Sequence, residues 1–240
     1  MNKFARFLVS FGPAALAFLL IFNFPASRLH SQGLEIINPP WIGGWVIAYP
    51  NADTPALSAS ISISRSGTPI PSLIVRIDDT HNLTETRPGN YYATDIAYPS
   101  IPFNMPLKIS IKSRLRTDPE IFADGRVSAL VEFISPKPGT VIDLRTSAFV
   151  KVQWKYTAGS AAVERIMLIK EGTGGGIDFT GIGAATSYEI PRDRLAPNSS
   201  YRLLLVVKLN DFKFKDARLV ASRSIINLYI YIYTSFRTAP

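Results

Sequence analysis

The chain has 240 residues, of which 47% are hydrophobic and 18% are charged, and its formal net charge is +8. This composition is that of a globular protein, and the length suits one or two domains. The sequence contains no cysteine and two histidines, His30 and His81. Disulfide bridges and thiolate metal sites are therefore excluded, and a metal site built from several histidines would need more than one chain.

Residues 1–31 predict an export signal. Lys3 and Arg6 precede an uncharged run from Phe7 to Phe24, and the small-residue segment Pro25-Ala26-Ser27 follows it. This order is typical of a secretory signal peptide. The run is close to the roughly 20 residues that span a bilayer, so a retained membrane-anchor helix is one alternative and a buried soluble helix is another. With a signal or an anchor, we expect the rest of the chain to be exported to the periplasm, the cell surface or the extracellular space.

From residue 32 onward, the sequence predicts an all-β protein of two tandem antiparallel β-sandwiches. Short alternating or fully apolar runs are separated by clusters of Pro, Gly, Asn and Ser. Their spacing is typical of sandwiches and differs from the strand–helix alternation of a parallel sheet. The predicted strands are Leu57–Ser64, Ser72–Ile77, Tyr91–Ala97, Leu107–Ser113, Ala129–Ile134, Phe149–Lys155, Arg165–Lys170, Ser187–Ile190, Tyr201–Lys208, Ala217–Ser222 and Ile225–Thr234.

We place the boundary between the two sandwiches near Asp118–Arg126, where turn signals flank a short segment. This divides the chain into residues 1–31, 32–125 and 126–240. Lys and Arg number 7 against 9 Asp and Glu in residues 32–125, but 16 against 9 in residues 126–240. A basic domain attracts anions such as phospholipid headgroups, acidic glycans or nucleic acid. A general solubilising charge is the interpretation that we favour, and nucleic acid is the partner that we favour least.

The second half contains the spacing of a tyrosine corner. The segment from Leu195 to Tyr201 reads L-x-P-x-S-x-Y. In this motif Pro197 turns the chain between sheets, Leu195 fills the core, and the Tyr201 hydroxyl bonds to backbone across the corner. Val150, Val152 and Trp154 alternate along an earlier strand, so we expect all three on its core face. The predicted core markers are Trp154, Leu195, Pro197 and Tyr201.

On these residues, together with Pro136–Gly139 and Tyr188-Glu189-Ile190, about residues 128–236 resemble the fibronectin type III family; a bacterial immunoglobulin-like sandwich of another kind is the alternative. The resemblance implies a non-catalytic binding or spacer module. The long Gly-rich segment Glu171–Gly183 departs from the family pattern; it predicts a flexible hairpin connection and leaves the middle strands open. In the first half, the motifs Gly-x-Pro, Val-x-Ile-Asp and Gly-x-Tyr follow one another in an order similar to that of exported β-sandwich modules. We use this similarity only as support for the fold class.

Three neighbouring strands of the second half are apolar on both faces, so one apolar face must point away from the core. Soluble monomers rarely leave such a stripe bare. We therefore predict that this sheet face is an interface, covered by the first domain, by a second copy or by another protein. Its predicted anchors are Met167, Ile169, Leu204, Val206, Tyr229, Tyr231 and Tyr233.

The remaining polar motifs favour structural interpretations. Asp78-Asp79, with Glu85 and Asp95 nearby, lacks the spacing of a calcium-binding loop and is typical of turns. His81 lies in a polar segment, and the sequence has no G-x-S-x-G nucleophile elbow to partner it. A solvated loop histidine is therefore the interpretation that we favour.

The sequence therefore predicts an exported, non-catalytic binding or structural protein that acts through protein–protein contacts in adhesion, envelope assembly or scaffolding. We expect no catalytic residues, no metal and no cofactor, because no acid/base pair and no metal-ligand spacing stands out. The alternative is an accessory module that binds glycans or an anionic membrane surface. Trp41 and Trp45, which lie between turn formers, are its candidate ligand-stacking residues; packing in the first domain is their other interpretation.

Overall fold

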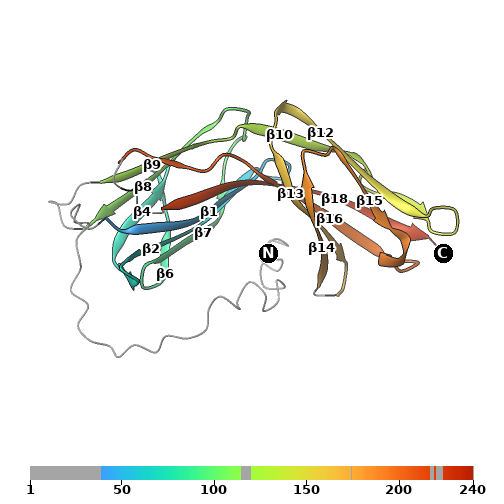
Figure 1. Ribbon diagram of the computed structural model, residues 1–240, viewed down its shortest axis with the longest axis horizontal. Coiled ribbons are helices and arrows are strands. Elements are labelled where there is room, and N and C mark those ends of the chain that lie inside the picture. Colours follow the sequence, from blue (N-terminus) through green and yellow to red (C-terminus); the bar gives the residue numbers. More distant parts are fainter. Residues whose placement is uncertain (1–38, 115–119, 174, 217–218, 220–223, 240) are drawn as a thin grey trace.

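The structure is a computed structural model that describes residues 39–114, 120–173, 175–216, 219 and 224–239. Strands dominate this part of the chain, which confirms the all-β class. The strands form two sandwiches that meet at an angle, so that the molecule is an arch in Figure 1. The predicted signal or anchor lies outside the described residues, and no helix within them is long and apolar enough to cross a membrane.

The first sandwich has the strand arrangement of an immunoglobulin domain. One sheet pairs β1-β2-β7-β6 and the other pairs β9-β8-β4-β5, which corresponds to strands A-B-E-D packed against G-F-C and a short extra strand. The strands are β1 (Trp41–Tyr49), β2 (Ala56–Arg65), β3 (Thr68–Pro69), β4 (Leu73–Ile77), β5 (His81–Asn82), β6 (Thr84–Arg87), β7 (Asn90–Ala97), β8 (Pro106–Ser113) and β9 (Ile121–Arg126).

The second sandwich packs the three strands β10-β12-β15 against the four strands β14-β13-β16-β18. This arrangement confirms the fibronectin type III-like sandwich. Its elements are β10 (Ala129–Ser135), β11 (Thr140–Asp143), β12 (Phe149–Gly159), β13 (Ala162–Lys170), β14 (Gly176–Gly183), β15 (Ser187–Pro191), the 3-10 turn η1 (Arg192–Arg194), β16 (Ser200–Lys208), β17 (Lys213–Phe214) and β18 (Ile225–Ala239).

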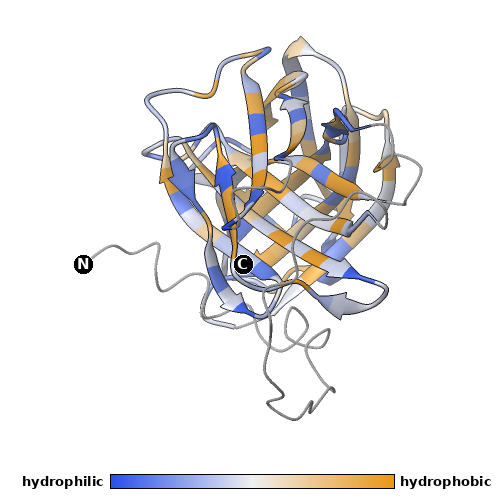
Figure 2. Cartoon of the chain, turned by 90° about the vertical axis from the view of Figure 1, so that its left-hand side faces the viewer, coloured by the Kyte–Doolittle hydropathy of each residue, from blue (hydrophilic) through white to orange (hydrophobic). Residues whose placement is uncertain are grey.

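Alternation along the strands builds the core. Figure 2 shows apolar and polar positions following one another along many strands, as expected where one sheet face is buried. Val150, Val152 and Trp154 are all at most 2% exposed, so the prediction that they share the core face is confirmed. Leu195 and Tyr201 are also buried, whereas Pro197 is exposed at the corner.

The last strand, β18, belongs to both sandwiches. Its first residues, Ile225 to Ile230, run parallel to β1 of the first sandwich. Residues Tyr229 to Arg237 run antiparallel to β16 of the second sandwich. One continuous sheet, here called the shared sheet, therefore passes from β14 through β18 to β6 and lies on the underside of the arch in Figure 1.

A second connection reinforces this link. Residues that follow β16 return to the first sandwich, where β17 pairs with β9. The buried ring of Phe212 lies directly over Gly125 of β9, so close that a Cβ on Gly125 would meet the ring at 2.6 Å. Sequence from the second half thus completes both sheets of the first sandwich, and the division at residues 125/126 stays a prediction.

Several elements differ from the sequence predictions. The strand β9, which pairs with β8, was not among the predicted strands; it lies in the segment Asp118–Arg126, near which we place the boundary. The Gly-rich segment Glu171–Gly183 is not only a connection, because Gly176–Gly183 forms β14 and pairs with β13. Both strands lack a regular apolar alternation, so only their backbone hydrogen bonds reveal them. The predicted strand Ala217–Ser222 lies almost entirely outside the described residues.

Candidate functional site

The shared sheet has one face turned away from both cores, here called the arch face. In β16 and β18, the residues that pack in the core alternate with a second set that does not. The cross-strand pairs place this second set on the arch face together with residues of β13, β1, β2 and β7. The arch face comprises Trp45, Ile47, Tyr49, Ser58, Ser60, Ser62, Tyr92, Arg165, Met167, Ile169, Arg202, Leu204, Val206, Tyr229, Tyr231 and Tyr233.

All seven predicted interface residues lie on the arch face. Met167, Ile169 and the three tyrosines of β18 are half-buried. Leu204 and Val206 point outward as predicted, but each is only 1% exposed, which corrects their expected role as exposed anchors.

Flanking side chains explain this burial. Leu204 lies between Met167 and Tyr233, and Val206 lies between Arg165 and Tyr231. These four longer side chains enclose the two shorter ones on the sheet surface. Leu204 and Val206 therefore form the base of a small apolar cluster that is separate from the core.

A tyrosine from the first sandwich joins the tyrosines of β18. The ring of Tyr49 stacks on Tyr233 at 6.3 Å between centroids and meets Tyr231 edge-on at 5.7 Å. Burial raises the pKa of all three hydroxyls well above the usual value of a tyrosine. The three tyrosines thus form an aromatic cluster that spans the junction of the two sandwiches, and their hydroxyls stay protonated at any physiological pH.

Sequence reasoning missed Tyr49 because β1 and β18 are far apart in the chain. The parallel pairing of Ala48 with Ile230 brings Tyr49 beside Tyr231. A signal was nevertheless present, since Trp45, Ile47 and Tyr49 alternate with the core residues Val46 and Ala48.

An ion pair and a further tyrosine border the aromatic cluster. Arg165 lies 3.5 Å from the carboxylate of Asp178 on β14. Tyr229 is the tyrosine nearest the start of β18, and burial, followed by the nearby charge of Glu164, raises its pKa to about 12. A neutral aromatic centre with a polar rim is the general composition of protein interfaces.

The two predicted stacking residues lie on β1: Trp45 belongs to the arch face, and Trp41 lies at the start of the same strand. Trp41 is 44% exposed, and its indole lies over Gly43, where a side chain would collide with it. Trp45 contacts Tyr92 edge-on at 6.2 Å. Both indoles therefore lie outside the core, together with a row of serines that β2 contributes to the same face: Ser58, Ser60, Ser62 and Ser64.

The acidic residues of the first sandwich are engaged in turns. Asp78 and Asp79 both have positive φ angles. Asp78 accepts hydrogen bonds from the Tyr98 hydroxyl at 2.6 Å and from the Lys108 backbone at 2.8 Å. Asp79 forms an ion pair with the Lys108 ammonium at 2.7 Å. The carboxylate of Glu85 likewise accepts hydrogen bonds from the backbone N–H groups of Ser72 and Gly89, which lie in two different turns.

The structure does not bring these acids together as ligands. Across the described ranges, no group of three or more His, Asp or Glu residues could hold a metal ion. His81 is in the short strand β5 and is half-buried beside the ring of Tyr98, at 5.6 Å. The prediction of a fully solvated loop histidine is therefore wrong in detail, because β5 pairs with β4.

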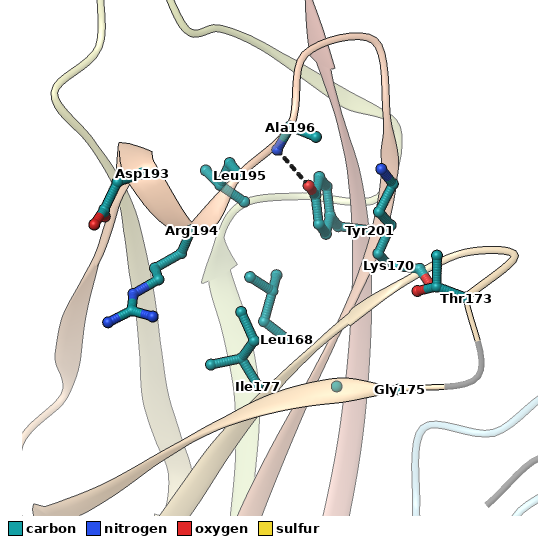
Figure 3. A pocket seen from close by; sticks show the side chains of 11 residues that line it. Leu168, Lys170, Thr173, Gly175, Ile177, Asp193, Arg194, Leu195, Ala196 and Tyr201 are labelled. Atoms are coloured by element: carbon teal, nitrogen blue, oxygen red, sulfur yellow. Dashed lines mark hydrogen bonds between the residues drawn. The ribbon is translucent and has the colours of Figure 1, made fainter. Parts of the chain in front are cut away.

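The tyrosine corner forms as predicted. The Tyr201 hydroxyl accepts a hydrogen bond from the backbone N–H of Ala196 at 2.6 Å, drawn as a dashed line in Figure 3. Tyr201 also stacks on Phe236 of β18, with 5.4 Å between centroids. The corner therefore fixes η1 and the start of β16 against the last strand.

No family model and no curated protein matches this chain. Among the similar solved structures is one described as tandem Ig repeats of Dlar, at 15% identity. That comparison covers 80% of this chain and 98% of the other, with a TM-score of 0.29. A similarity at this level says nothing about what the chain binds.

Proposed function

We propose that the protein is an exported, non-catalytic binding protein that holds another protein of the cell envelope or extracellular space against the arch face. Adhesion, envelope assembly and scaffolding are the roles that this proposal covers. The order of Lys3, Arg6 and the following apolar run supports export.

The observation that carries the proposal is the aromatic cluster of Tyr49, Tyr231 and Tyr233 on the outer face of the shared sheet. Tyrosine is enriched at protein interfaces because its ring adds apolar contact area and its hydroxyl adds a hydrogen bond. Met167 and Ile169 extend the apolar surface along β13. Because β18 joins both sandwiches, the cluster is held on a continuous sheet, and little ordering is needed on binding.

Photo-crosslinking in the producing cells tests this proposal. A benzophenone amino acid replaces Tyr229 on the arch face, and in a matched control it replaces Phe149, which is 43% exposed on β12 of the opposite sheet. We expect a discrete crosslinked protein, or a second copy of the chain, from position 229 and none from position 149. Equal crosslinking from both positions, or from neither, would contradict the proposal.

Glycan binding is a second candidate function, favoured by the aromatic side chains around Trp41 and Trp45 of β1. There the exposed indole of Trp41 and the pair of Trp45 with Tyr92 offer flat apolar rings beside serine hydroxyls. Affinity electrophoresis in gels that contain neutral or acidic polysaccharides tests it. We expect the polysaccharide to retard the protein, and Trp41→Ala with Tyr92→Ala to abolish the retardation. Retardation that survives both substitutions would exclude this site.

A further inference from the structure

We infer that a recess at the open edge of the second sandwich binds a free single-chain anionic amphiphile, such as a medium-chain carboxylate. The strands β14 and β15 are the edge strands of the two sheets on this side. The rings of Phe179 and Tyr188, 5.2 Å apart, join these edges at one level. Beyond this contact, a recess of about 520 Å³ opens between β13, β14 and the η1 corner.

The walls of the recess are apolar and rigidly placed. Leu168 and Ile177 are direct partners across β13 and β14, and both line the cavity with Leu195 and Tyr201, as Figure 3 shows. Leu168, Leu195 and Tyr201 are at most 8% exposed. The Tyr201 hydroxyl accepts a hydrogen bond from the N–H of Ala196, and Tyr201 lines the recess beside Leu195. The volume lies within the range of roughly 300–1,000 Å³ that small-molecule sites occupy.

The rim of the recess is cationic. Lys170 at the end of β13 and Arg194 of η1 both line it, on opposite sides in Figure 3. Neither makes an ion pair within the described part of the chain. Asp193 is the acidic side chain of the lining, so the rim carries two positive charges against one negative charge.

This combination defines the chemistry of the occupant. An apolar body would replace water along Leu168, Ile177 and Leu195, and an anionic head would reach Lys170 or Arg194 at the mouth. A neutral amphiphile would form no ion pair with Lys170 or Arg194. A small hydrophilic anion would leave the apolar walls in contact with water. The cationic rim and the apolar walls together therefore favour an anion that carries a hydrocarbon chain.

Isothermal titration calorimetry with sodium decanoate tests the inference, using the protein as purified from cells that express the full chain. The variant Lys170→Gln with Arg194→Gln removes the rim charges. Ile177→Trp fills the recess from an edge position that is 37% exposed. Lys151→Gln is the matched control, since Lys151 is exposed on β12 and outside the recess. Circular dichroism verifies that each variant is folded.

We expect decanoate to bind at least ten times more weakly to the rim variant and to Ile177→Trp, and unchanged to Lys151→Gln. Decanol should bind the unaltered protein more weakly than decanoate does. Equal decanoate affinity in the rim variant and the control, or no binding up to the solubility limit, would overturn the inference. It would also be overturned if phosphatidylglycerol vesicles bound in a manner sensitive to Lys170 and Arg194 while free decanoate did not.

Discussion

Replacing Ile226 by Ala should destabilise both sandwiches at once. Ile226 is fully buried in the part of β18 that pairs with β1, opposite Gly44. Removal of its side-chain carbons leaves a cavity that costs about 3 kcal/mol, which lowers the Tm of a chain of this size by roughly 6–12 °C. Ile225 is the matched control, because it is the adjacent residue and is 51% exposed. Ile225→Ala should change stability by less than about 0.5 kcal/mol.

The tryptophans allow each sandwich to be followed separately. Trp41 and Trp45 are in β1 of the first sandwich, and Trp154 is in β12 of the second. Urea unfolding is measured by fluorescence in a Trp154→Phe background, which reports the first sandwich, and in a background without Trp41 and Trp45, which reports the second. Because β18 hydrogen-bonds to both, we expect Ile226→Ala to shift both transitions equally. A shift in the first sandwich alone would refute the coupling through the shared strand.

Three further changes probe other parts of the structure. Gly125→Val should cost about 1–3 kcal/mol by overpacking, because its side chain would meet the Phe212 ring, and Phe212→Leu should partly restore the urea midpoint. Tyr201→Phe should cost about 0.5–1.5 kcal/mol, since the half-buried Ala196 N–H loses its acceptor; a midpoint equal to that of the unaltered protein would contradict this. Tyr229 has a pKa raised to about 12, so its folded state holds the phenolic proton more tightly than its unfolded state. The stability that this pKa difference contributes is complete below about pH 10 and is lost as the pH rises toward 12. The Tyr229→Phe protein should therefore lose less stability between about pH 10 and 12 than the unaltered protein does. Equal losses of the two proteins, measured by chemical denaturation at each pH, would contradict this.

Local patterns were sufficient to predict the core face of β12 and the tyrosine corner of the second sandwich. The alternation of Val150, Val152 and Trp154 and the spacing from Leu195 to Tyr201 both report short-range geometry, and the structure bears them out. The strands β9 and β14 were missed because their side chains are too irregular or too exposed to show a period of two. Their presence depends on backbone pairing with β8 and β13.

The arch face could be predicted only in part. The alternation within β13, β16 and β18 is visible in the sequence, so Met167, Ile169 and the tyrosines of β18 could be assigned to one surface. The alternation of Trp45, Ile47 and Tyr49 is local, but the contribution of Tyr49 depends on a parallel pairing between segments about 180 residues apart, which no local pattern predicts. The burial of Leu204 and Val206 likewise depends on which side chains flank them across the strands.

The recess followed from no motif. Leu168 and Ile177 come from strands that meet in a hairpin, but the cavity also needs η1 and the corner segment, which lie far along the chain and line its other side. In the sequence, Lys170 and Arg194 contribute only to the net positive charge of residues 126–240. Their position at one mouth is a result of the tyrosine corner, which holds η1 over the end of β13.

Where the protein works, we propose, a protein partner covers the arch face. Because the chain contains no cysteine, a single cysteine can be placed at Tyr229 or, as a control, at Phe149 on the opposite sheet. The measurement is the rate of labelling by a membrane-impermeant maleimide in intact cells and in the purified protein. We predict that Phe149→Cys is labelled in both, whereas Tyr229→Cys is labelled in the purified protein and protected in cells. Equal labelling of both positions in cells would contradict the account.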